Sequence, residues 1–373
     1  MKTFLKYKRI YLLILIPISY LLTLAAKKNS DFAEHVFALH IYKWISQVIS
    51  TISGIFPFSL AEVILLVLPI ISFIIIIRFT ICIVKDKEGR KTRLWKGLLN
   101  VLCTGSVVLF LFTVLAGLNY YRYPFSYYTN LEVKDSSVEE LYSLTESLAL
   151  QANELRAKVT ETNENGEFKL SESINELSDM TGAAMESLSE EYPVLGGHYA
   201  SPKPVLLSSE MSRTEITGIF IPFTMEANVN IKIPDYSIPS TMLHELAHLR
   251  GYMKEDEANY IAYLAGMNAD NVELKYSSTM LALVISGNAL YEQDTDLYFE
   301  IRGLYFVGVL KDIRANSAYW QQYDDTVIST ISDKINDTYL KANAQADGVK
   351  SYGRMLDLLL AKQRQDADLD NDG

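Results

Sequence analysis

The stretch STMLHELAHLRGYMKEDEANYIAYLA, from Ser240 to Ala265, decides how the rest of the chain is interpreted. Its centre places His244 and His248 four residues apart, with Glu245 directly after the first histidine. On a helix, residues four apart lie on the same face, so both imidazoles can reach one metal ion. Glu245 can then lean over the open coordination position and take a proton from water. The HExxH spacing therefore predicts a zinc-binding helix with Glu245 as general base.

A turn and a run of carboxylates follow this motif. Gly251 comes three residues after His248, and glycine can end a helix with a positive φ. A second helix that begins near Lys254 would bring a carboxylate back to the metal, and the two candidates are Glu255 and Glu257. Two residues apart on a helix, these side chains point to different faces, so we expect only one of them to bind.

Asn259 favours Glu255, because the two are four residues apart. The pair resembles the ExxxD element of the gluzincin metallopeptidases, in which Glu is the third ligand and Asp supports a ligand histidine. The resemblance implies that Glu255 binds the metal and that the amide oxygen of Asn259 orients an imidazole. Asn replaces the family's Asp, Asp256 is an alternative supporting group, and the gap after the second histidine is shorter than in gluzincins. In the related metzincin pattern HExxHxxGxxH, the third-ligand place falls on Lys254, which cannot bind while protonated.

Three apolar stretches near the N-terminus, about 10–26, 61–84 and 98–118, predict membrane spans. Each is nearly free of charge, and a bilayer crossing takes about 20 residues. A cleaved signal peptide is the alternative for the first stretch, but two further spans follow it. Basic residues precede the first span and fill the loop between the second and third, which is typical of the cytoplasmic side. We therefore expect a multi-pass cell-membrane protein with a cytoplasmic N-terminus and an extracytoplasmic C-terminal domain.

The charge of the chain changes at the end of the third span. Residues 1–118 carry 14 Lys+Arg and 5 Asp+Glu, a net of +9, whereas the rest carries 20 and 40, a net of −20, which together give the overall −11. An acidic C-terminal part argues against a nucleic-acid partner, because phosphate binding needs clustered Lys and Arg. The only cysteines, Cys82 and Cys103, lie in the N-terminal part, so the acidic part has no disulfide framework.

The rest of the sequence predicts a mostly helical α+β fold. Capped helical patterns alternate with short β-branched and aromatic runs, among them TGIFIPFTMEANVNIKIP from Thr217 to Pro234, which we interpret as strand, one edge of which suits an extended peptide. Tyr352 or Arg354 could stabilise an oxyanion. The expected organisation is a membrane domain over 1–118 with an interfacial amphipathic helix about 31–55, a juxtamembrane linker over 119–134, a zincin-like domain over 135–365 and an acidic tail over 366–373.

The three spans, the strand segment, the HELAH helix and the C-terminal YLKANAQADGVKSYGRMLDLLLA together resemble an uncharacterised family of bacterial three-span membrane proteins. That family is catalogued as a domain of unknown function and is assigned by its motif to the zincin-like metallopeptidases. The resemblance implies a membrane-anchored zinc peptidase that hydrolyses protein or peptide substrates outside the cytoplasm. It implies Zn²⁺ held by His244, His248 and Glu255, with Glu245 catalytic. The alternatives are a non-catalytic zinc-containing envelope scaffold or receptor-like protein and, third, hydrolysis of a non-peptide amide.

Overall fold

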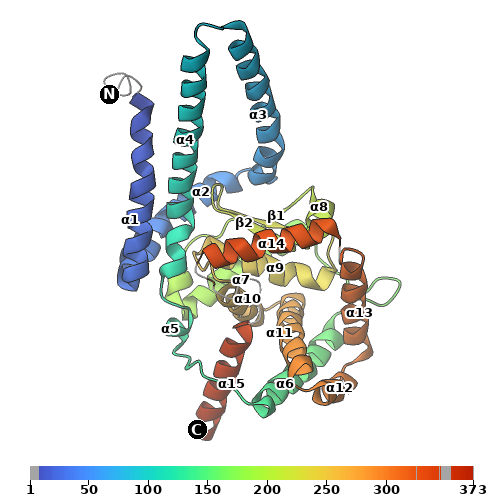
Figure 1. Ribbon diagram of the computed structural model, residues 1–373. Coiled ribbons are helices and arrows are strands. Elements are labelled where there is room, and N and C mark those ends of the chain that lie inside the picture. Colours follow the sequence, from blue (N-terminus) through green and yellow to red (C-terminus); the bar gives the residue numbers. More distant parts are fainter. Residues whose placement is uncertain (1–7, 325, 344, 346–353, 373) are drawn as a thin grey trace.

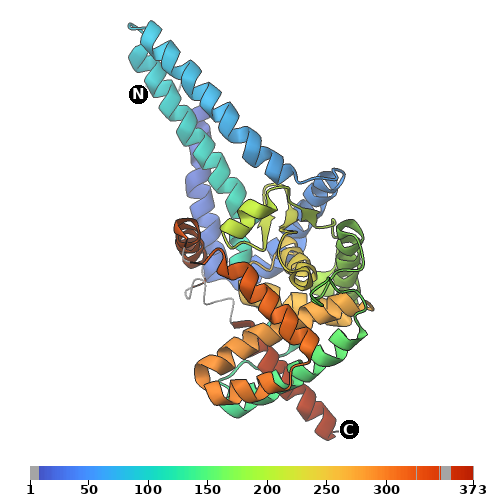
Figure 2. The same cartoon turned by 90° about the vertical axis from the view of Figure 1, so that its right-hand side faces the viewer.

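The computed structural model describes residues 8–324, 326–343, 345 and 354–372. Long helices extend away from a helical domain that contains one small sheet (Figure 1). The second view shows the same helices projecting to one side of that domain (Figure 2). The fold is therefore mostly helical with a three-stranded sheet, as the sequence predicted at this level of detail.

Three helical segments near the N-terminus are long and apolar enough to cross a membrane. They are η1 (Lys8–Ile14) continued by α1 (Leu15–Lys28), α3 (Leu60–Lys85) and α4 (Arg90–Leu115). Most of their large apolar side chains are exposed, which is expected of surfaces that face lipid. The third ends three residues earlier than predicted, because Ala116 leaves the helical conformation, with φ −147°.

The segment between α1 and α3 consists of a π-helix, η2 (Phe32–Tyr42), and a helix, α2 (Lys43–Gly54). One face of the segment is buried and carries Phe37, Tyr42, Glu34 and small side chains. The other face is apolar and exposed, with Val36, Ile41, Trp44, Val48, Ile52 and Ile55. The amphipathic helix expected at about 31–55 is therefore present, and its apolar face has no cover among the described residues.

The remaining elements form the domain that carries the HELAH motif. In chain order they are η3 (Gly117–Tyr121), α5 (Ser126–Thr129), α6 (Val138–Lys158), α7 (Ile174–Glu191), η4 (Pro193–Leu195), β1 (Lys203–Pro204), α8 (Ser208–Arg213), β2 (Gly218–Ile221), β3 (Glu226–Val229), η5 (Asp235–Ser237), α9 (Ile238–Leu249), α10 (Glu255–Asn268), α11 (Val272–Gln293), α12 (Thr295–Gly303), α13 (Val307–Gln321), α14 (Val327–Ala342) and α15 (Met355–Asp372). Ser137 and Ser173 close capping boxes with Glu140 and Glu176, which explains where α6 and α7 begin.

The sheet has the strand order β1-β3-β2. β1 runs parallel to β3, pairing Lys203 with Asn228, and β2 runs antiparallel to β3, pairing Gly218 with Val229. The hairpin of β2 and β3 lies within the strand segment that the sequence predicted. β2 is an edge strand, and β3 packs on α9.

Buried ionic contacts join this sheet to the start of α3. Glu226 of β3 accepts hydrogen bonds from the backbone N–H groups of Leu60 and Ala61 and is paired with Lys203 at 2.6 Å. Glu62 of α3 in turn accepts from the N–H groups of Leu206 and Leu207. Because a carboxylate stabilises a helix N-terminus, these contacts fix α3 to the sheet from both sides.

Two parts of the expected domain organisation look different in the structure. The stretch 119–134, expected to be a linker, packs into the domain core, because Phe125 is fully buried against the rings of Tyr252 and Tyr260. The stretch expected to be an acidic tail continues α15 as far as Asp372. One hydrophobic core runs from Ala26 through this stretch to Ala361, and it includes the ends of α1 and α4 that adjoin the domain.

Candidate metal centre

Two helices and the turn between them bring the motif residues together. α9 begins with Pro239 in its first turn, where proline is well tolerated, and it ends before Gly251. Gly251 has φ 89°, as its position in the sequence predicted, and its N–H donates to the carbonyl oxygen of His248. A side chain at Gly251 would lie 2.9 Å from the ring of Tyr42, so packing as well as conformation requires glycine there. α10 then begins at Glu255.

The side chains of His244, His248 and Glu255 converge on one point. One ligand atom from each lies within 4.8 Å of the other two. The Glu255 carboxylate is 3.1 Å from Nε2 of His244 and 3.6 Å from Nε2 of His248. Two ligands that bind one zinc ion at about 2.0–2.1 Å in tetrahedral geometry are about 3.4 Å apart, so these separations fit such an ion.

The second nitrogen of each ring is held by a partner. Nδ1 of His244 lies 2.7 Å from the amide oxygen of Asn259, and Nδ1 of His248 donates to the carbonyl oxygen of Tyr252 over 2.7 Å. Both Nε2 atoms therefore remain directed at the centre, as the outer partners of metal-binding histidines require. Glu257 points elsewhere, to Lys254 at 3.2 Å, so only Glu255 returns to the histidines.

The electrostatics of the cluster suit a cation. Burial alone would raise the pKa of the Glu255 carboxyl, but the adjacent charges and hydrogen bonds of His248 and His244 outweigh burial and lower the pKa to about 2. Burial alone would lower the pKa of His248, but Glu255 and then Glu245 outweigh it and raise the pKa to about 9. A divalent ion at this point would supply the positive charge that balances the Glu255 carboxylate.

Glu245 lies beside the cluster against the edge strand β2. Burial raises the pKa of its carboxyl, the two histidines lower it, and Oε2 is buried without a hydrogen-bond partner. A Cβ atom at Gly218 would lie 2.5 Å from Oε1 of Glu245, so the strand approaches this closely only because it carries glycine there. A group that takes a proton from a water molecule needs an oxygen atom that is not bound to another partner. Oε2 of Glu245 is such an oxygen, beside three side chains that can bind a metal.

Sequence reasoning missed the residues that hold the far end of α9. The Tyr42 hydroxyl donates to the carbonyl oxygens of His248 and Leu249 at 3.3 and 3.2 Å. The Arg122 guanidinium donates to the carbonyl oxygen of Arg250 and pairs with buried Glu34 at 2.6 Å. Tyr42 and Arg122 are far from the HELAH motif along the chain. The one signal in the sequence was the helical spacing of apolar residues in the 31–55 segment, which indicates that one face of that helix is buried.

The sequence suggested two residues that could stabilise an oxyanion near the site, Tyr352 and Arg354. Tyr352 lies outside the described residues, so the structure does not place it. Arg354 is exposed, and its charge acts on Asp256 and Asp357 rather than on the histidines. On the opposite side of the cluster, Gln345 is buried and accepts a hydrogen bond from the N–H of Glu255 at 3.2 Å. Gln345 therefore helps to position the returning carboxylate.

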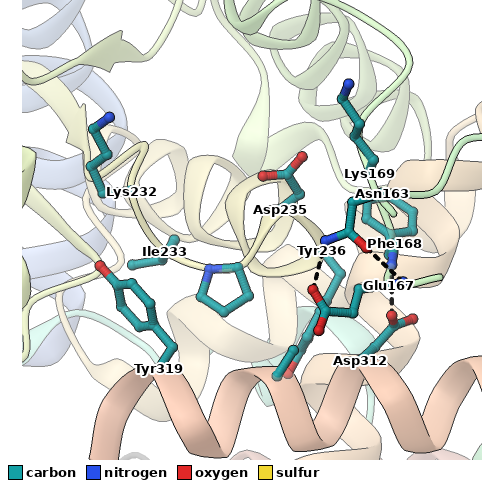
Figure 3. A pocket seen from close by; sticks show the side chains of 12 residues that line it. Asn163, Glu167, Phe168, Lys169, Lys232, Ile233, Asp235, Tyr236, Asp312 and Tyr319 are labelled. Atoms are coloured by element: carbon teal, nitrogen blue, oxygen red, sulfur yellow. Dashed lines mark hydrogen bonds between the residues drawn. The ribbon is translucent and has the colours of Figure 1, made fainter. Parts of the chain in front are cut away.

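A separate cavity of about 380 Å³ lies away from these residues, between α13 and the loops that precede α7 and α9 (Figure 3). Its carboxylates already have partners. Asp312 accepts from the N–H of Phe168, and Glu167 accepts from Asn163 (Figure 3). Asp312 also accepts from Arg156 and from the Tyr276 hydroxyl. These two carboxylates therefore take part in a network of hydrogen bonds and ion pairs, and they do not form a second reactive site.

The sequence matches the family described as "Protein of unknown function (DUF3810)" over residues 37–360. No curated protein and no solved structure matches the chain. The matched range includes Tyr42 and α2 as well as the whole cluster around His244, so the family match covers the two parts of the chain that meet at the end of α9.

Proposed function

The chain belongs to the DUF3810 family, and from that premise and the geometry of its histidine cluster we propose that it is a membrane-anchored, zinc-dependent metallopeptidase. The observation that carries the proposal is the convergence of His244, His248 and Glu255, with the unpartnered carboxylate oxygen of Glu245 beside them. Three protein ligands with room for a fourth are typical of catalytic zinc, whereas structural zinc sites are closed by four.

Each residue has a defined task in the proposed reaction. His244, His248 and Glu255 would hold the zinc ion, which would supply a Lewis acid for the scissile carbonyl and for the attacking water. Glu245 accepts a proton from the attacking water and delivers it to the leaving amine. Asn259 and the carbonyl oxygen of Tyr252 keep the imidazoles in the required orientation. The free edge of β2 is suited to pair with an extended peptide.

The distribution of basic residues supports an orientation in the membrane. They lie before α1 and between α3 and α4, and such clusters remain in the cytoplasm. With three crossings, the domain that carries the cluster is then outside the cytoplasm. The substrates of the proposed enzyme are accordingly polypeptides of the cell envelope.

The test uses the full chain, because the apolar helices share a core with the domain. The purified protein in lipid nanodiscs is assayed for zinc content and for cleavage of a peptide library. We expect about one zinc per chain and hydrolysis that Glu245→Gln abolishes without loss of zinc. His244→Ala should lose both zinc and hydrolysis.

The controls separate the proposed enzyme from a scaffold. Glu167→Gln changes a half-buried carboxylate of the separate cavity, away from the cluster, so its zinc content and activity should equal those of the wild type. One zinc per chain with no cleavage of any peptide would instead identify a non-catalytic zinc protein. Absence of tightly bound metal from the wild-type protein would end the peptidase proposal.

A further inference from the structure

The apolar side chains of α14 point away from the domain, which is unusual for a helix on the surface of a water-soluble domain. Val327, Ile331, Ile335 and Tyr339 recur every fourth residue and are 76%, 53%, 65% and 41% exposed. The opposite side faces the domain and buries Ser329 and Leu340. A surface helix in water shows the reverse arrangement, with its apolar stripe turned to the core.

The C-terminal end of α14 meets one of the apolar helices. The ring of Tyr339 lies edge-on to the ring of Phe112 in α4, with centroids 6.3 Å apart, and its hydroxyl accepts from the Tyr120 hydroxyl at 3.1 Å. Phe112 is three residues from the end of α4, the helix that would leave the bilayer there. The apolar face of α14 thus continues the surface of α4.

The direction of α14 fits a helix that lies in the membrane surface. α14 runs across the axes of α3 and α4 at the height where these helices join the domain (Figure 1). Seen from the side, α14 and α2 lie on opposite flanks of the molecule at a similar height (Figure 2). α2 also exposes its apolar side chains and buries its serines, so two helices with the same outward pattern border the same face.

Charged residues on α14 occupy the positions that an interfacial helix needs. Lys334 borders the apolar stripe between Ile331 and Ile335, where a long basic side chain can reach the lipid headgroups. Asp333 and Asp337 lie away from the stripe, and Asp337 pairs with Lys341 at 2.7 Å. An apolar strip with lysine at its border and acids behind it is typical of helices that lie on a bilayer.

We propose that the apolar face of α14 binds the lipid bilayer that the apolar helices cross, in the interface of the leaflet on the domain's side. The inference rests on the membrane location of these helices and not on the proposed hydrolysis. α14 is joined to the surroundings of the metal cluster at two places. Ser332 donates to the carbonyl oxygen of Thr214, four residues before β2, and Gln345, just beyond α14, accepts from Glu255. Lipid binding by α14 therefore brings the cluster close to the membrane surface.

The experiment measures which medium α14 touches. The full chain with Cys82→Ser is reconstituted in phosphatidylcholine–phosphatidylglycerol nanodiscs, and a small fluorophore is attached at Ile331→Cys or Ile335→Cys. The control is Asp333→Cys on the polar side of the same helix. The Cys82→Ser chain gives the background from Cys103, which is buried. Quenching by nitroxide-labelled lipid is compared with quenching by aqueous iodide.

We expect lipid quenching at positions 331 and 335 to exceed that at 333 by about threefold or more, with iodide showing the opposite order. Equal iodide access at the three positions would show that the stripe faces water, and would overturn the proposal. Protection from both quenchers that is lost on dilution to one chain per disc would identify a second copy as the occupant, which also overturns it. Neither measurement involves zinc or turnover, so failure here leaves the metallopeptidase test unaffected.

Discussion

The Tyr42 hydroxyl and the His248 carbonyl oxygen lie 3.3 Å apart, although 206 positions separate the two residues along the chain. This hydrogen bond joins the helix that precedes the second apolar span to the end of the HELAH helix. The same turn is held by Arg122, whose guanidinium lies 4.0 Å from the centre of the Tyr252 ring. The geometry of the histidine cluster therefore depends on residues that flank the long apolar helices.

Tyr42→Phe tests this dependence. The substitution removes hydrogen bonds to two buried carbonyl oxygens while it keeps the ring that packs on Gly251. We expect the free energy of unfolding to fall by about 1–2 kcal/mol and zinc to be released to a chelator faster than from the wild type. Thermal unfolding and chelator competition in detergent measure both. Tyr20→Phe on the exposed face of α1 is the matched control, and equal effects of the two substitutions would contradict the prediction.

Glu255 and Glu257 should differ sharply in their effect on metal binding. Glu255→Gln removes the one carboxylate that, among the described residues, groups with both histidines. Zinc affinity should therefore fall by more than about 100-fold, which exceeds the effect of losing an outer partner. Glu257→Gln changes a carboxylate that faces Lys254, and zinc affinity should remain close to that of the wild type. Isothermal titration with zinc measures both. The reverse order would assign the third ligand to Glu257.

Asn259 should act through His244. Asn259→Ala removes the oxygen that holds Nδ1 at 2.7 Å, and zinc affinity should fall by about 10–100-fold. Asn259→Asp restores an oxygen at the same place and should recover most of that loss, a rescue that a purely structural role would not produce. Zinc titrations of the three proteins decide the matter, and equal affinity for the alanine variant and the wild type would remove Asn259 from the site.

Gly218→Ala should impair catalysis without affecting the metal. The added methyl group would meet the Glu245 carboxylate and the Thr241 side chain, whereas none of the three ligands is among its nearest contacts. We expect normal zinc content with a kcat reduced by about 10-fold or more, because a displaced general base loses its contribution. The control is Gly303→Ala, where a new Cβ has open space. Loss of zinc in Gly218→Ala would show that β2 positions the ligands instead.

The Glu34–Arg122 pair should make stability depend on acidity. Burial raises the pKa of the Glu34 carboxyl, but hydrogen bonds and charge from Arg122, with further bonds from Tyr128 and the Tyr123 N–H, outweigh burial and leave the pKa lowered. A carboxyl with a lowered pKa in the folded state stabilises the protein above its ordinary pKa, and this stability is lost as the pH falls through the folded-state value.

The melting temperature of the wild-type protein should therefore fall as the pH decreases from about 5 to about 3. Glu34→Gln leaves the buried Arg122 unpaired and should cost about 3–5 kcal/mol at neutral pH while flattening that dependence. Asp31→Asn, which affects an exposed carboxylate on the same segment, should retain the wild-type slope. An unchanged slope in Glu34→Gln would exclude Glu34 as the responsible group.

The features that the sequence predicted well are those set by short separations along the chain. The four-residue spacing of the histidines, the glycine that ends α9 and the spacing from Glu255 to Asn259 each act within one or two helical turns, and the structure places these side chains together. The apolar helices were predictable for the same reason, because a long uninterrupted apolar run allows few alternatives.

The features that escaped prediction are contacts between distant segments. Nothing in the local sequence shows that Phe125 is buried under Tyr252, so the stretch around it looked like a linker. Tyr42 and Arg122 contact the end of α9 only because the chain folds back after the spans. The C-terminal acids continue α15, because no glycine or proline between Met355 and Asp372 ends the helix, and residues 366–368 are exposed.

The hydrogen bonds between Glu226 and the first turn of α3 fix the distance between the sheet and the start of that helix. The strand that holds α3 also pairs with β2, the strand that lies against Glu245. In the proposed enzyme, the bond that is hydrolysed would therefore lie at a constant distance from the start of α3, the second apolar helix. If the chain is the proposed peptidase, it would select cleavage sites in its substrates first by their distance from the membrane and only then by their side chains.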